Sequence, residues 1–241
     1  DTKCIIRELE RRHPDPTLFP GGAYGMAWGV GQWTDGPLFT DVITVALVEM
    51  APNMPPEFLA DRGPLYFGPD FSLEDIKSKY TDALVNIRAQ FGWFDERLKQ
   101  RDFMLGAEPG LPDALAYYLV WFLRDRMADG DRFLSQFESL IGWEQRVKAI
   151  GHGTPEEFSD LDALAIAKAA EPETPEQRDP GDPSGLDVGM AVTIAPASGG
   201  PRVVGTVRSL SPDQIAILRT DTQVGQVCVH FPRMGYRVTP A

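Results

Sequence analysis

The segment from Leu111 to Met127 is apolar on nearly every side of any helix that it forms. A surface helix of a globular protein is apolar on one face only, so a helix that is apolar all round is a buried one. The longest apolar run, Ala114 to Leu123, has about half of the ~20 residues that a membrane-spanning helix needs. We therefore expect this segment to be the central helix of a soluble helical bundle, with Leu119 and Trp121 inside it.

Amphipathic helices are predicted around this central one. The clearest runs from Ser72 to about Lys99, where large apolar residues recur every three or four positions and Ser72 opens the helix as an N-cap. Start and stop signals predict further helices at residues 23–33, 37–50, 57–67, 131–150 and 154–170, and a short amphipathic helix at residues 2–12. These segments together predict an all-α bundle over residues 21–170.

The sequence pattern changes after residue 170. Residues 171–185, EPETPEQRDPGDPSG, are acidic and rich in proline, which is typical of an exposed linker. Residues 186–241 hold five short β-branched runs that are separated by turn residues, and they predict a small antiparallel barrel or curled sheet. The fold class is therefore predicted to be multi-domain α+β, an all-α helical bundle followed by a small antiparallel β-barrel-like domain.

The charge and the few cysteines exclude several classes of function. The 241 residues carry a net charge of −12 and no block of Lys and Arg, which disfavours nucleic acid and an anionic membrane surface as partners. Cys4 and Cys228 stand far apart and the three histidines are scattered, so no disulfide framework and no metal site is predicted. Two cysteines and no visible signal peptide favour a cytoplasmic location.

Three stretches of the helical part resemble the C-terminal half of the soluble glutathione S-transferases. DTKCIIRELE at residues 1–10 is similar to the last helix of that family's thioredoxin-like domain. RDFMLG at 101–106 and PGLPD at 109–113 are similar to the stretch before its buried helix, and WEQRV at 143–147 is similar to its late Trp-x-x-Arg segment. The resemblance implies that residues 1–20 end a thioredoxin-like domain that is otherwise almost wholly absent, and that residues 21–170 are the family's C-terminal bundle.

The chain departs from the family pattern at two places. The family has Ser or Thr as the N-cap of its central helix, three residues before an Asp, and here Gly110 holds that position. Asp113 can still accept the free amide of Gly110, so we expect it to act as a structural cap. The family's first strands, with the Ser, Tyr or Cys that activates the glutathione thiol, would precede Asp1, so the catalytic residue is expected upstream of this chain.

The resemblance also implies a glutathione contact at the first helix. A helix N-terminus presents free amides that suit a carboxylate. Thr2 would hold the γ-glutamyl carboxylate of glutathione, and Asp1 would face its ammonium group. The alternative interpretation is a plain N-cap without any ligand.

An electrophile pocket lined by Tyr24, Trp28 and Tyr118 is the second implied site. Tyr24 and Trp28 are four residues apart on one predicted helix, with Gly25 and Gly29 beside them. Aromatic rings can stack on a hydrophobic substrate, and glycines allow it to approach the backbone closely. The alternative interpretation is that these aromatic side chains pack in the core.

One functional hypothesis is favoured and two others stay open. The favoured one is a glutathione S-transferase-like detoxification enzyme, cytoplasmic and homodimeric, in which the co-substrate glutathione attacks a small electrophile. A non-catalytic assembly or binding module of the same fold, with the β-domain as its docking surface, is the alternative. A plain helical domain that shares only the architecture is the third, because a fold does not determine a function.

Overall fold

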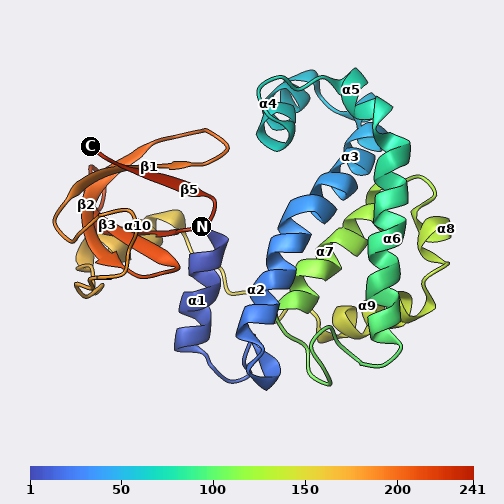
Figure 1. Ribbon diagram of the computed structural model, residues 1–241, viewed down its shortest axis with the longest axis horizontal. Helices are drawn as coiled ribbons and strands as arrows, with labels where there is room; N and C mark the ends of the chain where they lie inside the picture. The colour runs from blue at the N-terminus through green and yellow to red at the C-terminus, as the bar shows by residue number, and fades with distance from the viewer. The chain divides into compact units, whose positions relative to one another are not determined.

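The computed structural model describes residues 1–241 and divides the chain into two compact units. One unit, the bundle unit, consists of Asp15–Gly153. The other, the sheet unit, combines Asp1–Pro14 with Thr154–Ala241. The first helix of the chain, dark blue in Figure 1, therefore belongs to the same unit as the last strands, in orange and red.

The bundle unit is built from helices around one apolar core. In chain order they are α2 (Tyr24–Trp33), the π-helical turn η2 (Thr34–Leu38), α3 (Phe39–Met50), α4 (Pro56–Phe67), α5 (Leu73–Ser78), α6 (Tyr80–Leu98), α7 (Leu111–Arg126), α8 (Gly130–Leu134) and α9 (Glu138–Ile150). Two short 3-10 turns, η1 (Pro20–Gly22) and η3 (Ala51–Asn53), complete the unit. Its largest fully buried side chains include Phe91, Leu119 and Trp143.

Helix α7 lies at the centre of this bundle, but it is not buried on every side. Leu119 is fully buried, as expected, whereas Trp121 is 45% exposed, so the prediction for Trp121 is wrong. Helices α2, α3, α8 and α9 pack against α7 (Figure 1), yet they leave the side chain of Trp121 exposed. An apolar side chain on a central helix is thus part of the bundle's surface.

Residues 154–170 do not join the bundle, which ends at Gly153. Helix α10 (Asp160–Ala169) begins at the N-cap Ser159, and every one of its residues is exposed. Leu161 is 78% exposed, and Leu164 and Ile166 are exposed as well. Because Ala, Leu and Ile are spread around this short helix, it offers no single apolar stripe that a bundle would bury.

The sheet unit contains five antiparallel strands in the order β4-β3-β2-β1-β5. They are β1 (Ala191–Pro196), β2 (Val203–Leu210), β3 (Gln214–Asp221), β4 (Gly225–Pro232) and β5 (Tyr236–Pro240). Alternate side chains of the strands form a second apolar core with Leu186, and Val192, Ile194, Ile215 and Ile217 are at most a few per cent exposed.

The sheet is open, so the prediction of a barrel-like closure is wrong. Strands β4 and β5 are its two edges and do not pair with each other. Closure of a barrel needs continuous pairing between the edge strands, and β5 is only five residues long and ends at Pro240. Proline has no N–H to donate to a neighbouring strand, so this edge is poorly suited to further pairing.

The acidic segment between the helices and the sheet is fixed along β2. Gln177 forms a parallel bridge with Ser209, and the amide of Leu210 donates to the Gln177 carbonyl at 2.9 Å. The Arg208 guanidinium donates to the carbonyl of Thr174 at 2.9 Å and pairs with Glu176 at 2.8 Å. The linker is exposed, but these contacts tie it to the sheet.

Helix α1 (Thr2–Arg12) packs against β4 within the sheet unit. Arg7 forms an ion pair with Asp213 at 2.5 Å, which attaches the helix to the loop before β3. Ile5 is 58% exposed and Leu9 is 48% exposed, so part of the apolar stripe expected for this helix faces solvent. None of the helices of either unit is long and apolar enough to cross a membrane.

Burial predicts that replacing leucine by alanine costs much stability at one leucine and almost none at another. Leu119→Ala removes a fully buried side chain from the centre of the bundle and lowers the free energy of unfolding by about 2–5 kcal/mol. Leu161→Ala, at a side chain that is 78% exposed, changes it by less than about 0.5 kcal/mol. Urea denaturation followed by tryptophan fluorescence measures both variants, and equal losses would contradict the assignment of α7 as the central helix.

Candidate functional site

The buried carboxylate of Asp113 caps the start of α7 and is 1% exposed. Its Oδ2 accepts the amide of Gly110 at 2.9 Å, which is the reciprocal half of a capping box. Its Oδ1 accepts the amide of Met104 at 2.9 Å and the indole Nε1 of Trp143 at 2.7 Å. The sequence indicated the first of these hydrogen bonds, and only the structure shows the other two, which join α7 to the preceding loop and to α9.

A side chain at position 110 would clash with its neighbours, which explains why Gly110 stands where the family pattern has Ser or Thr. A Cβ at this position would lie 2.7 Å from Cδ of Pro20 and 3.0 Å from the carbonyl oxygen of Leu18. The segment before α2 passes directly over the start of α7, and the amide of Leu111 donates to Leu18 at 2.8 Å. Helix α7 thus lacks a side-chain N-cap because the segment of Leu18 and Pro20 lies so close to Gly110.

Burial raises the pKa of Asp113, and the three N–H donors oppose that rise. Taking a carboxylate out of water favours its neutral form, whereas N–H groups that point at it favour the charged form. Since both oxygens accept hydrogen bonds from N–H groups, the geometry is that of the ionised group. Its place beneath the first turn of α7 makes it a structural cap with no open path to a ligand.

A second polar contact inside the bundle joins α7 to α9. Glu144 is 5% exposed, and its two oxygens accept Nε of Arg124 at 2.9 Å and the terminal guanidinium nitrogen at 2.5 Å. This bidentate pairing is the geometry in which Arg binds a carboxylate most strongly. Glu144 is the second residue of the WEQRV segment. Its pairing with Arg124, 20 positions earlier, could not be predicted from the sequence.

Tyr24 and Trp28 form a small aromatic cluster with Phe19. The ring centroids of Tyr24 and Trp28 are 6.0 Å apart, and those of Phe19 and Tyr24 are 4.7 Å apart. Tyr24 is 44% exposed, and nothing lies within 4 Å of a Cβ added at Gly25 or Gly29. The cluster therefore runs from the buried ring of Phe19 through the half-buried Trp28 to Tyr24 at the surface.

Tyr118 lies in a different aromatic group. Burial, together with the nearby Asp35 carboxylate, raises the pKa of Tyr118. The ring of Phe39 is 6.5 Å from that of Tyr118, and the ring of Tyr66 is 5.7 Å from Phe39. No ring contact joins this group to Tyr24 and Trp28, so the structure brings together two of the three predicted pocket residues and places the third apart.

Asp35 is positioned by the π-helical turn η2 between α2 and α3. Gly36 leaves helical geometry at φ −108° and ψ −111°, and Pro37 supplies no amide to the helix ladder. The Thr34 hydroxyl donates to the carbonyl of Val30 at 3.0 Å and so satisfies one of the released groups. Turns of this type occur frequently at functional sites. Sequence reasoning missed Asp35, although Thr-Asp-Gly-Pro inside a helical stretch was a visible signal.

Asp1 and Thr2 lie at the N-terminus of α1, in the sheet unit. The Asp1 carboxylate accepts the amide of Lys3 at 2.8 Å and the hydroxyl of Tyr236 at 3.1 Å. Both Asp1 and Thr2 are exposed. The arrangement is that of an N-cap with one extra contact from β5, and a glutathione contact here stays a prediction.

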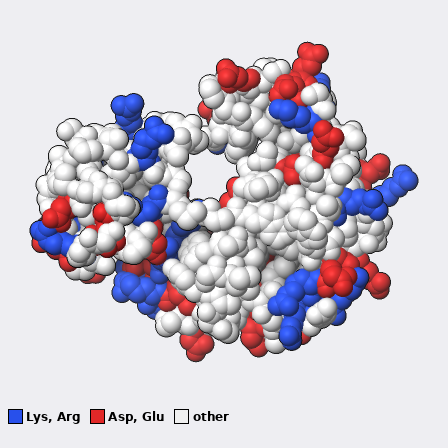
Figure 2. All heavy atoms as spheres, viewed as in Figure 1, with Lys and Arg blue, Asp and Glu red and all other residues white.

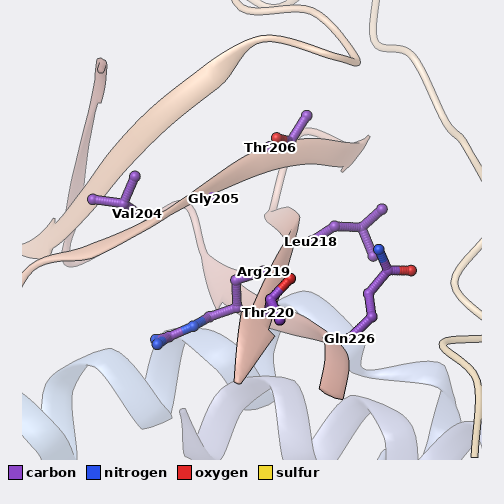
Figure 3. A pocket seen from close by; sticks show the side chains of 7 residues that line it. All are labelled: Val204, Gly205, Thr206, Leu218, Arg219, Thr220 and Gln226. Carbon is purple, nitrogen blue, oxygen red and sulfur yellow. The ribbon is translucent and has the colours of Figure 1, made fainter. Parts of the chain in front are cut away.

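A hollow of about 520 Å³ lies on the sheet, away from all these residues (Figure 3). It forms where β2 and β3 separate, since their pairing ends at Thr206 opposite Leu218 while β3 stays paired to β4 as far as Asp221. Figure 3 shows the side chain of Arg219 extending away from those of Leu218 and Gln226. No group of three or more His, Cys, Asp or Glu side chains in the structure could hold a metal ion.

Comparison with known proteins defines the class of the bundle. The family model described as "Glutathione S-transferase, C-terminal domain" matches residues 77–146, which run from α5 into α9. The crystal structure of a GST-like protein from Pseudomonas syringae is similar to this chain at 26% identity and a TM-score of 0.73. The match covers 100% of this chain and 77% of that one.

Residues 77–146 thus match the C-terminal domain of the glutathione S-transferases, and the chain as a whole is similar to a GST-like protein. A comparison with curated proteins found no match. The resemblance of this chain to the glutathione S-transferases is therefore confirmed.

The hydrogen bonds of Asp113 predict a large loss of stability on its removal. Asp113→Ala leaves the donors of Gly110, Met104 and Trp143 without an acceptor, and we expect the free energy of unfolding to fall by about 3–5 kcal/mol. Asp125→Ala on the same helix is the control, because Asp125 is exposed and pairs only with its neighbour Arg126. A melting temperature for Asp113→Ala equal to that of the control would reject the structural role.

Proposed function

We propose that this chain belongs to a glutathione transferase that conjugates the glutathione thiolate to a small hydrophobic electrophile, in the cytoplasm and as a route of detoxification. The observation that carries the proposal is the family match of the bundle. The exposed aromatic clusters support it, because they offer apolar surface to a second substrate. In this reaction the thiolate sulfur forms a bond to an electrophilic carbon, and the leaving group departs with the electron pair of its bond.

The proposal gives each group of residues a separate task. Thr2 and Asp1 bind the glutamyl end of glutathione at the N-terminus of α1. Tyr24 and Trp28 contact the electrophile through their ring faces, and Tyr118 adds a hydroxyl that can orient it. We assign the lowering of the thiol pKa to a residue outside these 241.

A non-catalytic binding module is the second candidate function. One observation favours it: the Asp1 carboxylate already accepts two hydrogen bonds from within the sheet unit. In that case the fold serves assembly, with the exposed strands of the sheet unit as the docking surface. Glutathione binding separates the two candidates, because only the transferase requires it.

We further propose that the protein is a homodimer that uses the outer face of α6. Val85 and Trp93 on this helix are each 63% exposed, and Gly92 beside Trp93 has nothing within 4 Å of an added Cβ. Trp33 packs on Trp93 with ring centroids 5.6 Å apart, which holds the exposed indole in place. A fixed, exposed aromatic side chain beside a small residue is typical of an interface core.

Glutathione binding tests the transferase proposal directly. In the protein produced from the complete coding sequence, Thr2→Ala and Asp1→Ala each weaken glutathione binding by about 1–3 kcal/mol, since each removes a hydrogen bond to a charged group. Thr2→Ser keeps the hydroxyl and binds as the unaltered protein does. If calorimetry detects no binding at millimolar glutathione, the transferase proposal fails and the binding module remains.

Substitution on α6 tests the homodimer. The unaltered protein has about twice the 26.6 kDa mass of the chain in light scattering, and Trp93→Glu raises the dimer dissociation constant about tenfold or more by burying a charge. Leu161→Glu on α10 is the control at another exposed apolar side chain. A monomeric unaltered protein, or a dimer that Trp93→Glu leaves intact, would exclude this face as the interface.

A further inference from the structure

Strands β2 and β3 separate at one end of the sheet and leave backbone groups there without a strand partner. Their pairing ends at Thr206 opposite Leu218. In an antiparallel ladder the backbone groups of alternate residues point to the same neighbouring strand. Val207 bonds to the segment before β1, so Val204 faces β3, and Thr220, two positions after Leu218, faces β2. Two N–H groups and two carbonyls therefore face the opening without a hydrogen bond from the opposite strand.

The hollow at this opening is also lined by polar side chains that the protein itself does not use. Its volume of about 520 Å³ lies within the range of about 300–1,000 Å³ that ligand pockets have. None of the hydrogen bonds or ion pairs of the structure engages its four polar side chains, Thr206, Arg219, Thr220 and Gln226. Figure 3 shows Arg219 extending to one side and Gln226 to the other. The apolar side chain of Val204, 57% exposed, lies between polar groups that are free to bind a ligand.

The guanidinium of Arg219 has no carboxylate paired with it. Asp221 on the same strand accepts the amides of Gln223 and Val224 at 2.8 and 3.3 Å, and these amides, ahead of Arg219, lower the pKa of Asp221. Residues 186–241 hold five Arg and no Lys against three Asp and no Glu. Figure 2 shows blue side chains without red ones on the upper part of the sheet unit, at the left of the view. The charge of this part of the chain therefore complements a carboxylate.

The sheet already holds one acidic extended segment, which belongs to this chain and lies along the other half of β2. Gln177 of that segment forms a parallel bridge with Ser209. Arg208 donates to the Glu176 carboxylate at 2.8 Å. Residues 171–177, EPETPEQ, contain three Glu and no basic residue. Backbone hydrogen bonds to a strand, together with one Arg–Glu pair, are thus sufficient contacts for an acidic segment on this sheet.

We propose that the opening between β2 and β3 binds an extended peptide of a partner protein, and that this peptide carries a carboxylate. A peptide has an N–H and a carbonyl at each residue, which match the free backbone groups of Val204 and Thr220. The carboxylate pairs with Arg219, and an apolar neighbour in the peptide contacts Leu218. Gly205 lines the hollow with bare backbone, so no side chain blocks the approach.

The inference goes beyond the proposed function. The hollow shares no residue with the groups assigned to glutathione or to the electrophile, so a peptide can bind to the transferase and to the binding module alike. Glutathione binding measured on the Arg219→Gln variant therefore equals that of the unaltered protein. The two proposals fail independently of each other.

Four short peptides separate the contribution of the carboxylate from that of the backbone. They are Ac-Val-Thr-Glu-Thr-Val-NH2, its counterparts with Gln or Lys at the centre, and the Gln peptide with a free C-terminal carboxylate. Val and Thr favour the extended conformation. NMR titration of the 241-residue chain gives a dissociation constant for each. We expect the Glu peptide to bind about fivefold more tightly than the amidated Gln peptide, as an exposed ion pair allows, and the Lys peptide to bind least.

The free C-terminus distinguishes two sources of the carboxylate. If the Gln peptide with a free C-terminus also binds more tightly than its amidated form, the site accepts the end of a chain. If it does not, the site takes an acidic side chain within a chain, and both results support the inference. Because the ion pair is exposed, about 0.5 M NaCl reduces the preference for the Glu peptide.

Two substitutions and one exchange measurement test the contacts themselves. Arg219→Gln removes the charge and keeps a polar side chain, so the Glu and Gln peptides then bind equally. Arg237→Gln on β5 is the matched control, because it removes an exposed arginine that does not line the hollow and leaves the preference intact. At saturating Glu peptide the amides of Val204 and Thr220 exchange with solvent about fivefold more slowly or less, as new backbone hydrogen bonds require.

The results either support the inference or overturn it. A preference for the Glu peptide that Arg219→Gln removes and Arg237→Gln retains, with slower exchange at Val204 and Thr220, confirms it. Equal binding of the Glu and Gln peptides to the unaltered chain, or a preference that survives in Arg219→Gln, overturns the role of Arg219. Unchanged exchange at both amides with the peptide bound overturns the backbone pairing. If none of the four peptides binds, the opening is not a peptide site.

Discussion

The hydrogen bonds of the Asp113 carboxylate determine how the bundle is assembled. One side chain joins the first turn of α7, the loop at Met104 and the indole of Trp143 on α9. Three segments of the bundle thereby share one acceptor group, and Asp113, Met104 and Trp143 are all buried. The Arg124–Glu144 pair repeats this connection further along α7. The position of α7 follows from these polar contacts as much as from its apolar side chains.

The exposed polar and aromatic side chains of the bundle lie where a helix is interrupted or where no other helix packs on it. The π-helical turn after α2 carries Asp35, whose carboxylate contributes to the raised pKa of Tyr118 on α7. Tyr24 and Trp28 are on the same helix as this turn but form their own cluster near its start. The bundle thus offers two aromatic surfaces with different character, one neutral and one with a carboxylate.

The sheet unit shows how a short amphipathic helix can find a partner far away in the sequence. Helix α1 packs against β4, and its Arg7 and Asp1 contact Asp213 and Tyr236 near the other end of the chain. The residues proposed for glutathione thus belong to the sheet unit, and those proposed for the electrophile belong to the bundle unit. The two proposed sites are therefore separately testable.

The sequence by itself predicted most of the helices, the strands, the capping residue and the resemblance to a family, because these depend on local periodicity, on the Gly110–Asp113 spacing and on short motifs. The tertiary structure alone decided that Trp121 is exposed, that the sheet is open and that Arg124 pairs with Glu144. Periodicity shows which face of an element is apolar but not which neighbour covers it, so it missed the open side of α7. Contacts such as Asp113–Trp143 and Arg124–Glu144 join residues 20 or more positions apart, and they exist only once the helices have packed.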